Sequence, residues 1–488
     1  MTTSEFKNII LRRFGFPPTD DQHDALDVFT HFLASRHHMP AMILRGSAGT
    51  GKTSLVASMV QALVGLKQKV VLLAPTGRAA KVLSLNSGLP ASTIHRKIYR
   101  QKKIGGDFSL DINLHADTLF VVDEASMIST QPQLQQDGMP MFMGNGGGVI
   151  DDLVTYVYSG RNCRMMLIGD TAQLPPVGED EAPALIGRVI ECYGIEVHEA
   201  NLTQVVRQEQ ESGILWNATM IRRLIAHDEA TELPKIRFSG FADIKMMPGG
   251  ELIDSLAESY YRMGKDDTIV VTRSNKRATI YNNGIRLRVL DHEDMLCSGD
   301  RLMIVKNHYF DVAPNGKDRD ENQLPFTFIA NGDVAIVRRV RHVRQLYGFT
   351  FADLTLQFPD YDDYEMELVA NLDALHSDAP GLTTEQQRRL FDGVMEDYMH
   401  IPHKDERMKQ LKQDIYYNAL VVKFAYAVTC HKAQGGQWSH VYVDQGYMTD
   451  DMLTPDYIHW LYTAFTRATQ KLFLVNWPEQ QVMANTNF

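Results

Sequence analysis

Residues 46–53 read Gly-Ser-Ala-Gly-Thr-Gly-Lys-Thr, which is the spacing of a phosphate-binding loop. Glycines let the backbone turn so that successive N–H groups face one anion. Lys52 can reach the outer phosphates of a nucleotide, and the hydroxyl of Thr53 can ligate Mg²⁺. The expected ligands are therefore a nucleoside triphosphate and Mg²⁺. The residues expected to form the cradle are Gly46, Ala48, Gly49, Thr50, Gly51, Lys52, Thr53 and Ser54.

The segments on either side of this loop have the patterns of a strand and a helix. Residues 41–45 form a short apolar run, and residues 54–66 carry apolar side chains at helical spacing. A glycine-rich turn that merely starts a helix is the alternative, and the strand, Lys52 and Thr53 together argue against it. A phosphate loop alone does not distinguish a motor from a kinase or a GTPase.

Two carboxylates, Asp123 and Glu124, directly follow the apolar run 119–122. Ligands of open α/β sheets bind at the carboxyl ends of strands. Asp123 is expected to hold Mg²⁺, and Glu124 is expected to polarise an attacking water, although an acidic turn that ends a strand is the alternative. After the next apolar run, 165–168, comes Gln173, whose amide can contact both a terminal phosphate and the attacking water.

Strand-like runs at 70–74, 119–122 and 165–168 alternate with helical runs such as 78–85. This alternation predicts an α/β fold with a parallel sheet. A chain of 488 residues exceeds what one hydrophobic core usually serves, and roughly 150 residues per domain predicts about three units.

The composition is that of an ordinary globular protein, with 44% apolar and 22% charged residues. No apolar run approaches the roughly 18 residues that span a bilayer, and the first residues lack the apolar core of an export signal. Widely spaced cysteines without a CxxC pair argue against a zinc site or a disulfide framework and favour a reducing cytoplasm. The four cysteines are Cys163, Cys192, Cys297 and Cys430.

The net charge of −11 is weak information about a nucleic-acid partner, because affinity for phosphates depends on a local basic track. Basic clusters occur at residues 95–103 and 338–344. Each cluster could belong to such a track or could be a solvated face.

A series of sequence blocks in the same order resembles the superfamily 1 helicases, with the closest resemblance to the RecD and Dda type. The blocks cover nearly the whole chain. They are Gln22, GSAGTGKTS at 46–54, LAPTGRAAKVL at 73–83, STIHR at 92–96, VVDEASM at 121–127, GDTAQLPPVG at 169–178, LTQVVRQ at 202–208, VTRSNKRATIYNNGIR at 271–286, GDRLMIVKN at 299–307, NGDVAIV at 331–337, AVTCHKAQGGQWSHVYV at 427–443 and YTAFTRATQKL at 462–472.

The resemblance implies two RecA-like motor domains with ATP between them. It implies that Arg207 and Arg467 stabilise charge on the transferred phosphoryl group and that Gln22 reads adenine. Without the resemblance, Arg467 would pass as a cation near the end of a helix that starts at 454–456, and Gln22 as a surface residue.

The resemblance also implies a track for single-stranded DNA. Short polar contacts to phosphate carry no sequence information, so binding should be nearly sequence-independent and sensitive to salt. The alternative for each residue is an ordinary polar turn at a strand end. The residues assigned to the track are Thr76, Thr93, His95, Thr429, His431 and Lys432.

Two insertions interrupt the motor pattern. Residues 97–104 and 107–114 flank a Gly-Gly turn and predict a hairpin, whose aromatic residue, Phe108 or Tyr99, could stack on the last base pair as a strand-splitting pin. Packing of Phe108 onto the core is the alternative. The loop 139–148, rich in Met and Gly, has no functional interpretation.

Alternating runs at 333–340, 349–358 and 365–369 predict a small inserted β barrel, and the resemblance implies an SH3-like domain packed against a helix at 384–399. The predicted division assigns 1–95 and 118–200 to the first RecA-like domain, 96–117 to the hairpin, 201–310 and 420–488 to the second RecA-like domain, and 311–419 to the barrel.

The function that the resemblance implies is an ATP-dependent DNA helicase that moves 5′→3′ on single-stranded DNA and opens duplex junctions. Single-strand-binding, replication or recombination proteins are candidate partners. Two alternatives stay open at this point: an RNA-directed or protein-displacing translocase of the same superfamily, and a phosphate-loop kinase or nucleotide switch. No residue fixes the direction of movement.

Overall fold

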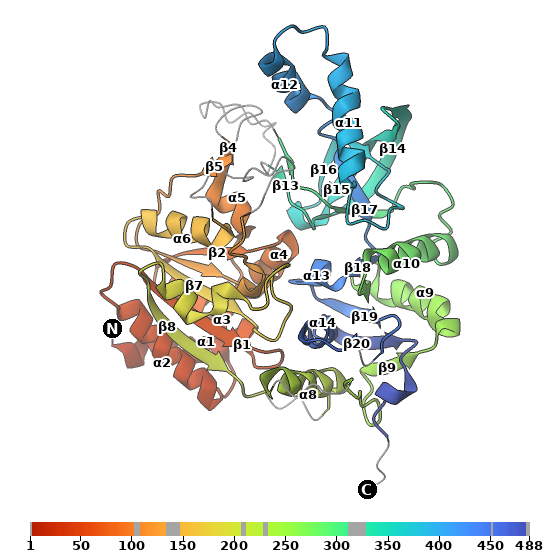
Figure 1. The fold of residues 1–488 in the computed structure, drawn as a ribbon. Coiled ribbons are helices and arrows are strands. Elements are labelled where there is room, and N and C mark those ends of the chain that lie inside the picture. Colours follow the sequence, from red (N-terminus) through yellow and green to blue (C-terminus); the bar gives the residue numbers. More distant parts are fainter. Residues whose placement is uncertain are drawn as a thin grey trace.

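The structure is a computed structural model of the chain and describes residues 2–101, 108–132, 147–205, 211–227, 233–310, 328–449 and 452–484. It contains two parallel sheets that lie side by side and a closed barrel above them (Figure 1). Among the described residues, none of the helices combines the length and the apolar character needed to cross a membrane. The predicted α/β class and the barrel insertion are confirmed.

The first sheet has six parallel strands in the order β3-β2-β6-β7-β1-β8. The central strands β1, β6 and β7 are buried on both faces, which is why they read as nearly continuous apolar runs. In β1, Met42 and Leu44 pack on one side with α1 to α3, whereas Ala41 and Ile43 pack on the other with α6. The strands are β1 (Pro40–Gly46), β2 (Lys69–Ala74), β3 (Ala91–Thr93), β6 (Thr118–Val122), β7 (Arg164–Gly169) and β8 (Glu196–Leu202), and the helices are α1 (Thr3–Phe14), α2 (Asp20–Ala34), α3 (Lys52–Gly65), α4 (Gly77–Ser87), α6 (Val149–Ser159) and α7 (Gly187–Glu191).

The second sheet has five parallel strands in the order β18-β10-β19-β20-β9. The predicted helix after Thr454 is confirmed as α14, with the Thr454 side chain accepting a hydrogen bond from the backbone N–H of Tyr457. The strands are β9 (Ile244–Met247), β10 (Thr268–Thr272), β18 (Ala427–Thr429), β19 (Trp438–Asp444) and β20 (Ala468–Val475), and the helices are α8 (Gly213–His227), α9 (Leu252–Met263), α10 (Asn275–Arg288), α13 (Cys430–Ala433) and α14 (Pro455–Phe465).

The barrel closes in the order β11-β14-β15-β16-β17. The three predicted runs are strands β14 (Val334–Leu346), β15 (Phe349–Phe358) and β16 (Tyr364–Asn371). The barrel also recruits β11 (Arg301–Ile304) and β17 (Leu420–Phe424), so it begins before and ends after the interval 311–419. Short strands β12 (His308–Tyr309) and β13 (Phe328–Ile329) pair beside it.

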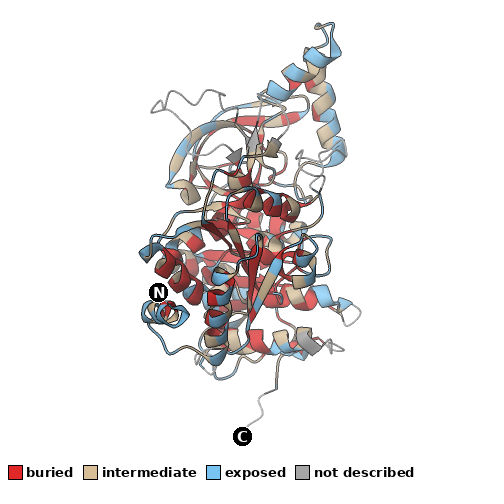
Figure 2. Cartoon of the chain, turned by 90° about the vertical axis from the view of Figure 1, so that its left-hand side faces the viewer, coloured by how far each residue is buried: buried red, intermediate tan, exposed pale blue. Residues whose placement is uncertain are grey.

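A helical arm extends from the barrel (Figure 1). The predicted helix is α11 (Thr384–Asp397), and α12 (Lys404–Gln413) follows it. Leu390 and Val394 of α11 pack on Phe349 and Phe351 of the barrel, as predicted. Figure 2 shows that buried residues concentrate in the sheets and barrel, whereas the arm is mostly exposed or half-buried.

The predicted hairpin is confirmed in part, because β4 (Tyr99–Gln101) and β5 (Phe108–Leu110) pair antiparallel. Its first strand does not begin at Lys97. Residues 94–98 form a short helix, α5, since the Thr93 hydroxyl accepts a hydrogen bond from the N–H of Arg96 and caps it. The turn at 102–107, the side chain of Phe108 and most of the 139–148 loop lie outside the described residues.

The barrel contacts the first half of the chain through Asp333, which precedes β14 and lies against Gly77 at the start of α4. A Cβ atom on Gly77 would lie 2.6 Å from Asp333 Oδ1. The carboxylate accepts hydrogen bonds from the N–H of Ala330 and the hydroxyl of Tyr361, while Oδ1 has no partner among the described residues. Burial therefore raises the pKa of Asp333 to about 7.

We expect stability to fall as the pH rises from 5 to 8, and the Asp333→Asn variant to flatten this dependence. The native state keeps the proton up to about pH 7, whereas the unfolded chain releases it near the ordinary Asp pKa, so stabilisation on the order of 2 kcal/mol or more is lost over this window. Thermal unfolding midpoints at several pH values measure it. Asp353→Asn is the control, because Arg344 and His342 hold the pKa of Asp353 below its usual range. Equal slopes in wild type and Asp333→Asn would contradict the prediction.

Candidate nucleotide site and nucleic-acid interface

The phosphate loop joins β1 to α3 in the conformation that its glycines require. Gly49 and Gly51 have φ angles of 79° and 73°, in the left-handed region that favours glycine. The Thr50 hydroxyl donates to the carbonyl oxygen of Ser47 over 2.8 Å and holds the turn. Lys52 starts α3, and no side chain caps that helix end. An open helix N-terminus beside a lysine fits a phosphate.

The carboxylates Asp123 and Glu124 follow β6 beside this loop, as predicted. The pKa of Asp123 is raised to about 6, because burial and the Glu124 carboxylate raise it more than Lys52 lowers it. Glu124 has a φ of 52° and its Oε2 is buried without a hydrogen-bond partner among the described residues. These two carboxylates, together with the exposed Thr53 of the phosphate loop, are a set of oxygen donors that suits Mg²⁺.

Gln173 lies after β7, the neighbour of both β6 and β1. Its side chain is 6% exposed, and its Oε1 has no hydrogen-bond partner in the described part of the chain. A buried, unsatisfied amide oxygen is costly unless a ligand or water completes it. Gln173 is therefore available to a group bound at the loop.

Gln22 contacts the loop from α2. Its Nε2 donates to the Thr50 carbonyl over 2.9 Å, and its Oε1 accepts from the N–H of Thr19 over 3.0 Å. The side chain, 1% exposed, thus ties α2 to the phosphate loop. Reading adenine would require the amide to exchange these partners, so that role stays a prediction.

The structure does not bring Arg467 to the loop. Its Nε donates to the Thr463 carbonyl and its Nη1 to the Gly436 carbonyl, over 3.0 and 3.1 Å, within the second half of the chain. Arg207 lies outside the described residues. The catalytic roles of both arginines stay predictions.

Two side chains that the sequence motifs did not assign do reach the loop from the second half. Arg222 of α8 donates to the Ser47 hydroxyl. The Tyr462 hydroxyl of α14 accepts from the N–H of Ala48. Nothing in the sequence around Arg222 signals this contact, whereas Tyr462 belongs to the 462–472 block and could have been singled out there.

A cavity of about 1830 Å³ lies where the two sheets and the barrel meet. Five of the six residues assigned to the DNA track line it, and Thr429, which precedes α13, does not. The hydroxyls of Thr76 and Thr93 cap α4 and α5, so the interpretation as polar turn residues also holds for them. The five lining residues are Thr76, Thr93, His95, His431 and Lys432.

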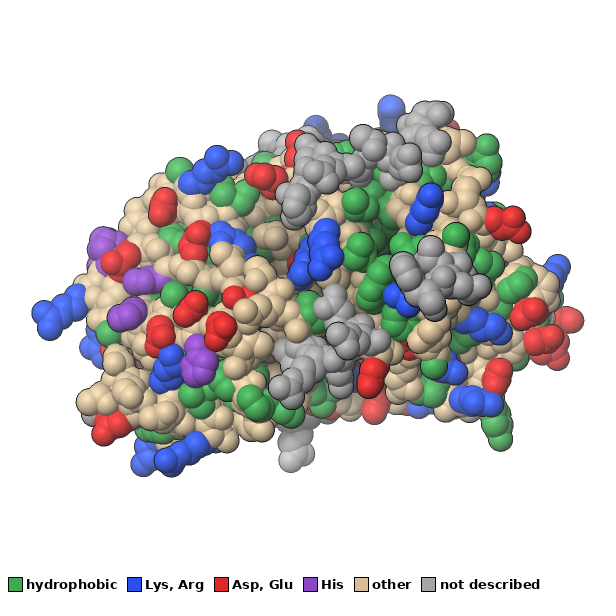
Figure 3. Space-filling view, turned by 90° about the horizontal axis from the view of Figure 1, so that it is seen from below, with side chains coloured by type: hydrophobic (Ala, Val, Ile, Leu, Met, Phe, Trp, Pro, Cys, Tyr) green, Lys and Arg blue, Asp and Glu red, His purple; other side chains and the backbone are tan. Residues whose placement is uncertain are grey.

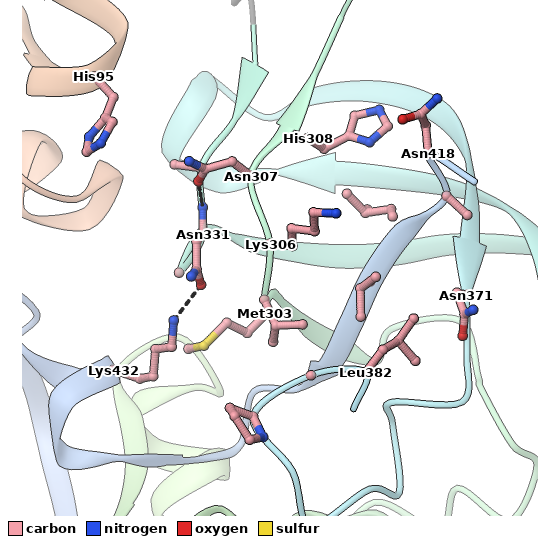
Figure 4. A pocket seen from close by; sticks show the side chains of 18 of the residues that line it. His95, Met303, Lys306, Asn307, His308, Asn331, Asn371, Leu382, Asn418 and Lys432 are labelled. Carbon is pink, nitrogen blue, oxygen red and sulfur yellow. Dashed lines mark hydrogen bonds between the residues drawn. The ribbon is translucent and has the colours of Figure 1, made fainter. Parts of the chain in front are cut away.

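Two lysines of the cavity, Lys306 and Lys432, make no ion pair with a carboxylate in the part of the chain that the structure describes (Figure 4). Lys432 donates to Asn331 Oδ1, and burial lowers its pKa to about 8. Burial also lowers the pKa of Lys306, from the 299–307 block, whose ammonium faces the cavity. Buried positive charge of this kind suits an anion such as a phosphate backbone.

The second basic cluster is a solvated face. On β14, Arg338 and Arg341 face Glu365 and Glu367 of β16, and Arg344 pairs with Asp353 over 2.7 Å. A different face, seen from below and away from the barrel, also shows acidic and basic side chains interspersed (Figure 3).

Comparisons with known proteins agree with this geometry. The family described as AAA domain matches residues 19–136, and the UvrD-like helicase C-terminal domain matches residues 424–475. The ATP-dependent DNA helicase dda of Enterobacteria phage T4 is 37% identical over 366 residues, covering 72% of this chain and 76% of that protein. The RecD2 helicase of Deinococcus radiodurans is 30% identical over 174 residues, which are 36% of this chain and 20% of that protein.

Among solved structures, a Bacteroides Pif1 helicase aligns over 96% of this chain and 95% of its own, with 13% identity and a TM-score of 0.44. Two parallel sheets with a phosphate loop, a carboxylate pair and a glutamine at neighbouring strand ends define a RecA-like nucleotide-hydrolysing motor. The chain belongs to the Dda family of superfamily 1 ATP-dependent DNA helicases.

We expect Gly49→Ala to weaken binding of a fluorescent ATP analogue by about tenfold or more. A side chain costs roughly 1–2 kcal/mol in the left-handed region, and its Cβ would lie 3.0 Å from Val205 Cγ1, so the loop must leave its present shape. Gly88→Ala is the matched control, since Gly88 has a φ of 73° at the end of α4 and no atom within 4 Å. Equal affinities for both variants would show that the loop shape is not required.

Proposed function

We propose that this helicase moves 5′→3′ along single-stranded DNA and opens duplex junctions, using ATP and Mg²⁺. The observation that supports this most strongly is the shared cavity, because residues of both sheets and the barrel line it. Movement between the sheets must therefore change the grip on whatever occupies it. The direction rests on membership of the Dda family.

We assign the nucleotide roles as follows, and the positions of the loop groups support the assignment. When bound, ATP would supply the phosphoryl group that is transferred, and Mg²⁺ would neutralise part of its charge. The loop N–H groups and Lys52 hold phosphates, Thr53 and Asp123 hold the metal, and Glu124 orients and deprotonates the water. Gln173 contacts the terminal phosphate. We assign Arg467 and Arg207 to the transition state, which requires Arg467 to leave its present carbonyl partners.

On the DNA side, we propose that the lining residues of the cavity contact the strand backbone and that the β4–β5 hairpin supplies the pin. Neutral hydroxyls and amides with a few cations permit release as well as binding. We propose the domain division predicted from the sequence. In it, the segments on either side of the interval 311–419 contribute strands β11 and β17 to the barrel. The free thiols of all four cysteines suit a reducing cytoplasm.

The decisive measurement is strand separation with ATP and Mg²⁺ on two matched partial duplexes, one with a 5′ tail and one with a 3′ tail. We expect selective opening of the 5′-tailed duplex. Lys52→Ala should lower DNA-stimulated ATP hydrolysis by about 100-fold or more, because it removes the cation at the outer phosphates. Lys69→Ala, at an exposed position at the start of β2, is the charge-matched control.

Each contrary outcome of that assay has a distinct meaning. Opening only from the 3′ tail would overturn the direction, and DNA-stimulated hydrolysis without separation would indicate a translocase without a working pin. Absence of DNA stimulation would overturn the motor function.

Binding of single-stranded DNA should weaken roughly tenfold between pH 7 and 9. Lys432 is charged below its pKa of about 8 and neutral above it, and only the charged form makes the stronger charge-assisted bond to phosphate. Fluorescence anisotropy of a labelled oligothymidine at constant ionic strength measures this. Lys432→Arg should remove most of the slope because guanidinium stays charged, whereas Lys69→Arg should keep it. A slope unchanged by Lys432→Arg would exclude Lys432 as its source.

A further inference from the structure

The hydroxyl of Tyr462 lies between the two halves of the nucleotide site. It accepts a hydrogen bond from the N–H of Ala48 over 2.9 Å and donates one to Asp170 Oδ2 over 2.7 Å. Tyr462 is 1% exposed and Asp170 3% exposed. Tyr462 comes from α14 beside the second sheet, whereas both of its partners lie at the carboxyl edge of the first.

The group that Tyr462 engages is one of the N–H groups that a phosphate loop offers to its anion. A neutral hydroxyl oxygen is a weaker acceptor for such a group than an anionic phosphate oxygen, whose hydrogen bonds are roughly twice as strong. A phosphate entering the cradle can therefore take over the Ala48 N–H. The displaced hydroxyl retains Asp170 as a hydrogen-bond acceptor.

Other contacts from the second half close over the same stretch of loop. The Arg222 guanidinium bonds to the Ser47 hydroxyl. Val205 and Leu215 crowd the position above Gly49, and Ala48 packs against the core that contains Leu461 of α14. The structure thus shows a loop covered by the second half of the protein.

Further hydrogen bonds connect Tyr462 with the residues at the end of α14. The Tyr462 carbonyl accepts from both the N–H and the hydroxyl of Thr466, and the Thr466 hydroxyl accepts from Arg467 Nη2. The Thr463 hydroxyl accepts from the N–H of Leu174 over 2.8 Å. These bonds connect Tyr462 with one helical turn and, through Thr463, with the loop that holds Gln173.

We propose that Tyr462 is a positioning residue that latches the phosphate loop in the nucleotide-free protein, by occupying the Ala48 N–H until the nucleotide phosphate replaces it. This rests on the proposed binding of ATP at the loop. If only a fraction of the molecules is unlatched, the apparent affinity for nucleotide is the intrinsic affinity multiplied by that fraction. Removing the hydroxyl therefore strengthens nucleotide binding, which is the opposite of what loss of a ligand contact would do.

The test is equilibrium binding of a fluorescent, non-hydrolysable ATP analogue with Mg²⁺ to the full chain. Tyr462→Phe should lower Kd about threefold to tenfold, the effect of one hydrogen bond. Tyr457→Phe is the matched control: it removes a buried hydroxyl from the same helix, but among the described residues that hydroxyl bonds only to Gln445 and Gln481 of the second half. Unchanged or weaker binding by Tyr462→Phe relative to this control would overturn the latch.

Hydrogen–deuterium exchange of the 46–54 segment without nucleotide gives a second readout that needs no activity. Exchange of the Ala48 amide should be faster in Tyr462→Phe than in wild type and Tyr457→Phe, and equal exchange would overturn the latch. Failure of the proposed nucleotide site itself would look different, since wild type would then bind the analogue no better than Lys52→Ala.

Discussion

Adjacency of three parallel strands, β6, β7 and β1, is the constraint on which the nucleotide site depends. Because parallel strands end at one edge, the groups that follow them must meet there. Asp123 and Glu124 follow β6, Asp170 and Gln173 follow β7, and the phosphate loop follows β1. Lys52 and Glu124 are then close enough to Asp123 to shift its pKa. Helix α14, beside the second sheet, contacts this edge through Tyr462, and residues of the barrel line the neighbouring cavity.

The sequence predicts best those groups whose function depends on residues only a few positions apart along the chain. Glycines of a phosphate loop, carboxylates after an apolar run, and Thr454 before Pro455 all act over a few residues, and the structure places each in the expected element. The start of α5 is also predictable from the sequence, because Thr93 is a good cap. The predicted strand from Lys97 is wrong because this cap starts a helix at Ile94 instead.

The features that the sequence does not predict depend on contacts between residues that lie far apart along the chain. β11 joins the barrel by pairing with β17, far along the chain, so neither strand could be recognised from its own residues. Arg222 and Tyr462 reach the loop only because α8 and α14 pack together beside it. The bond from Arg467 to the Gly436 carbonyl and the bond from Gln22 to the Thr50 carbonyl each join residues 31 and 28 positions apart within one half of the chain. Motif matching names such residues without fixing their partners.

The pairing of β9 with β20 has a consequence for how this protein is made. β9 starts at Ile244, yet its partner strand ends at Val475, close to the end of the chain. Contacts of such separation form late, since loop closure costs entropy before it gives burial. On the ribosome the first sheet can complete itself early, whereas the edge of β9 must wait unpaired. The second sheet is then the stage most exposed to aggregation during synthesis.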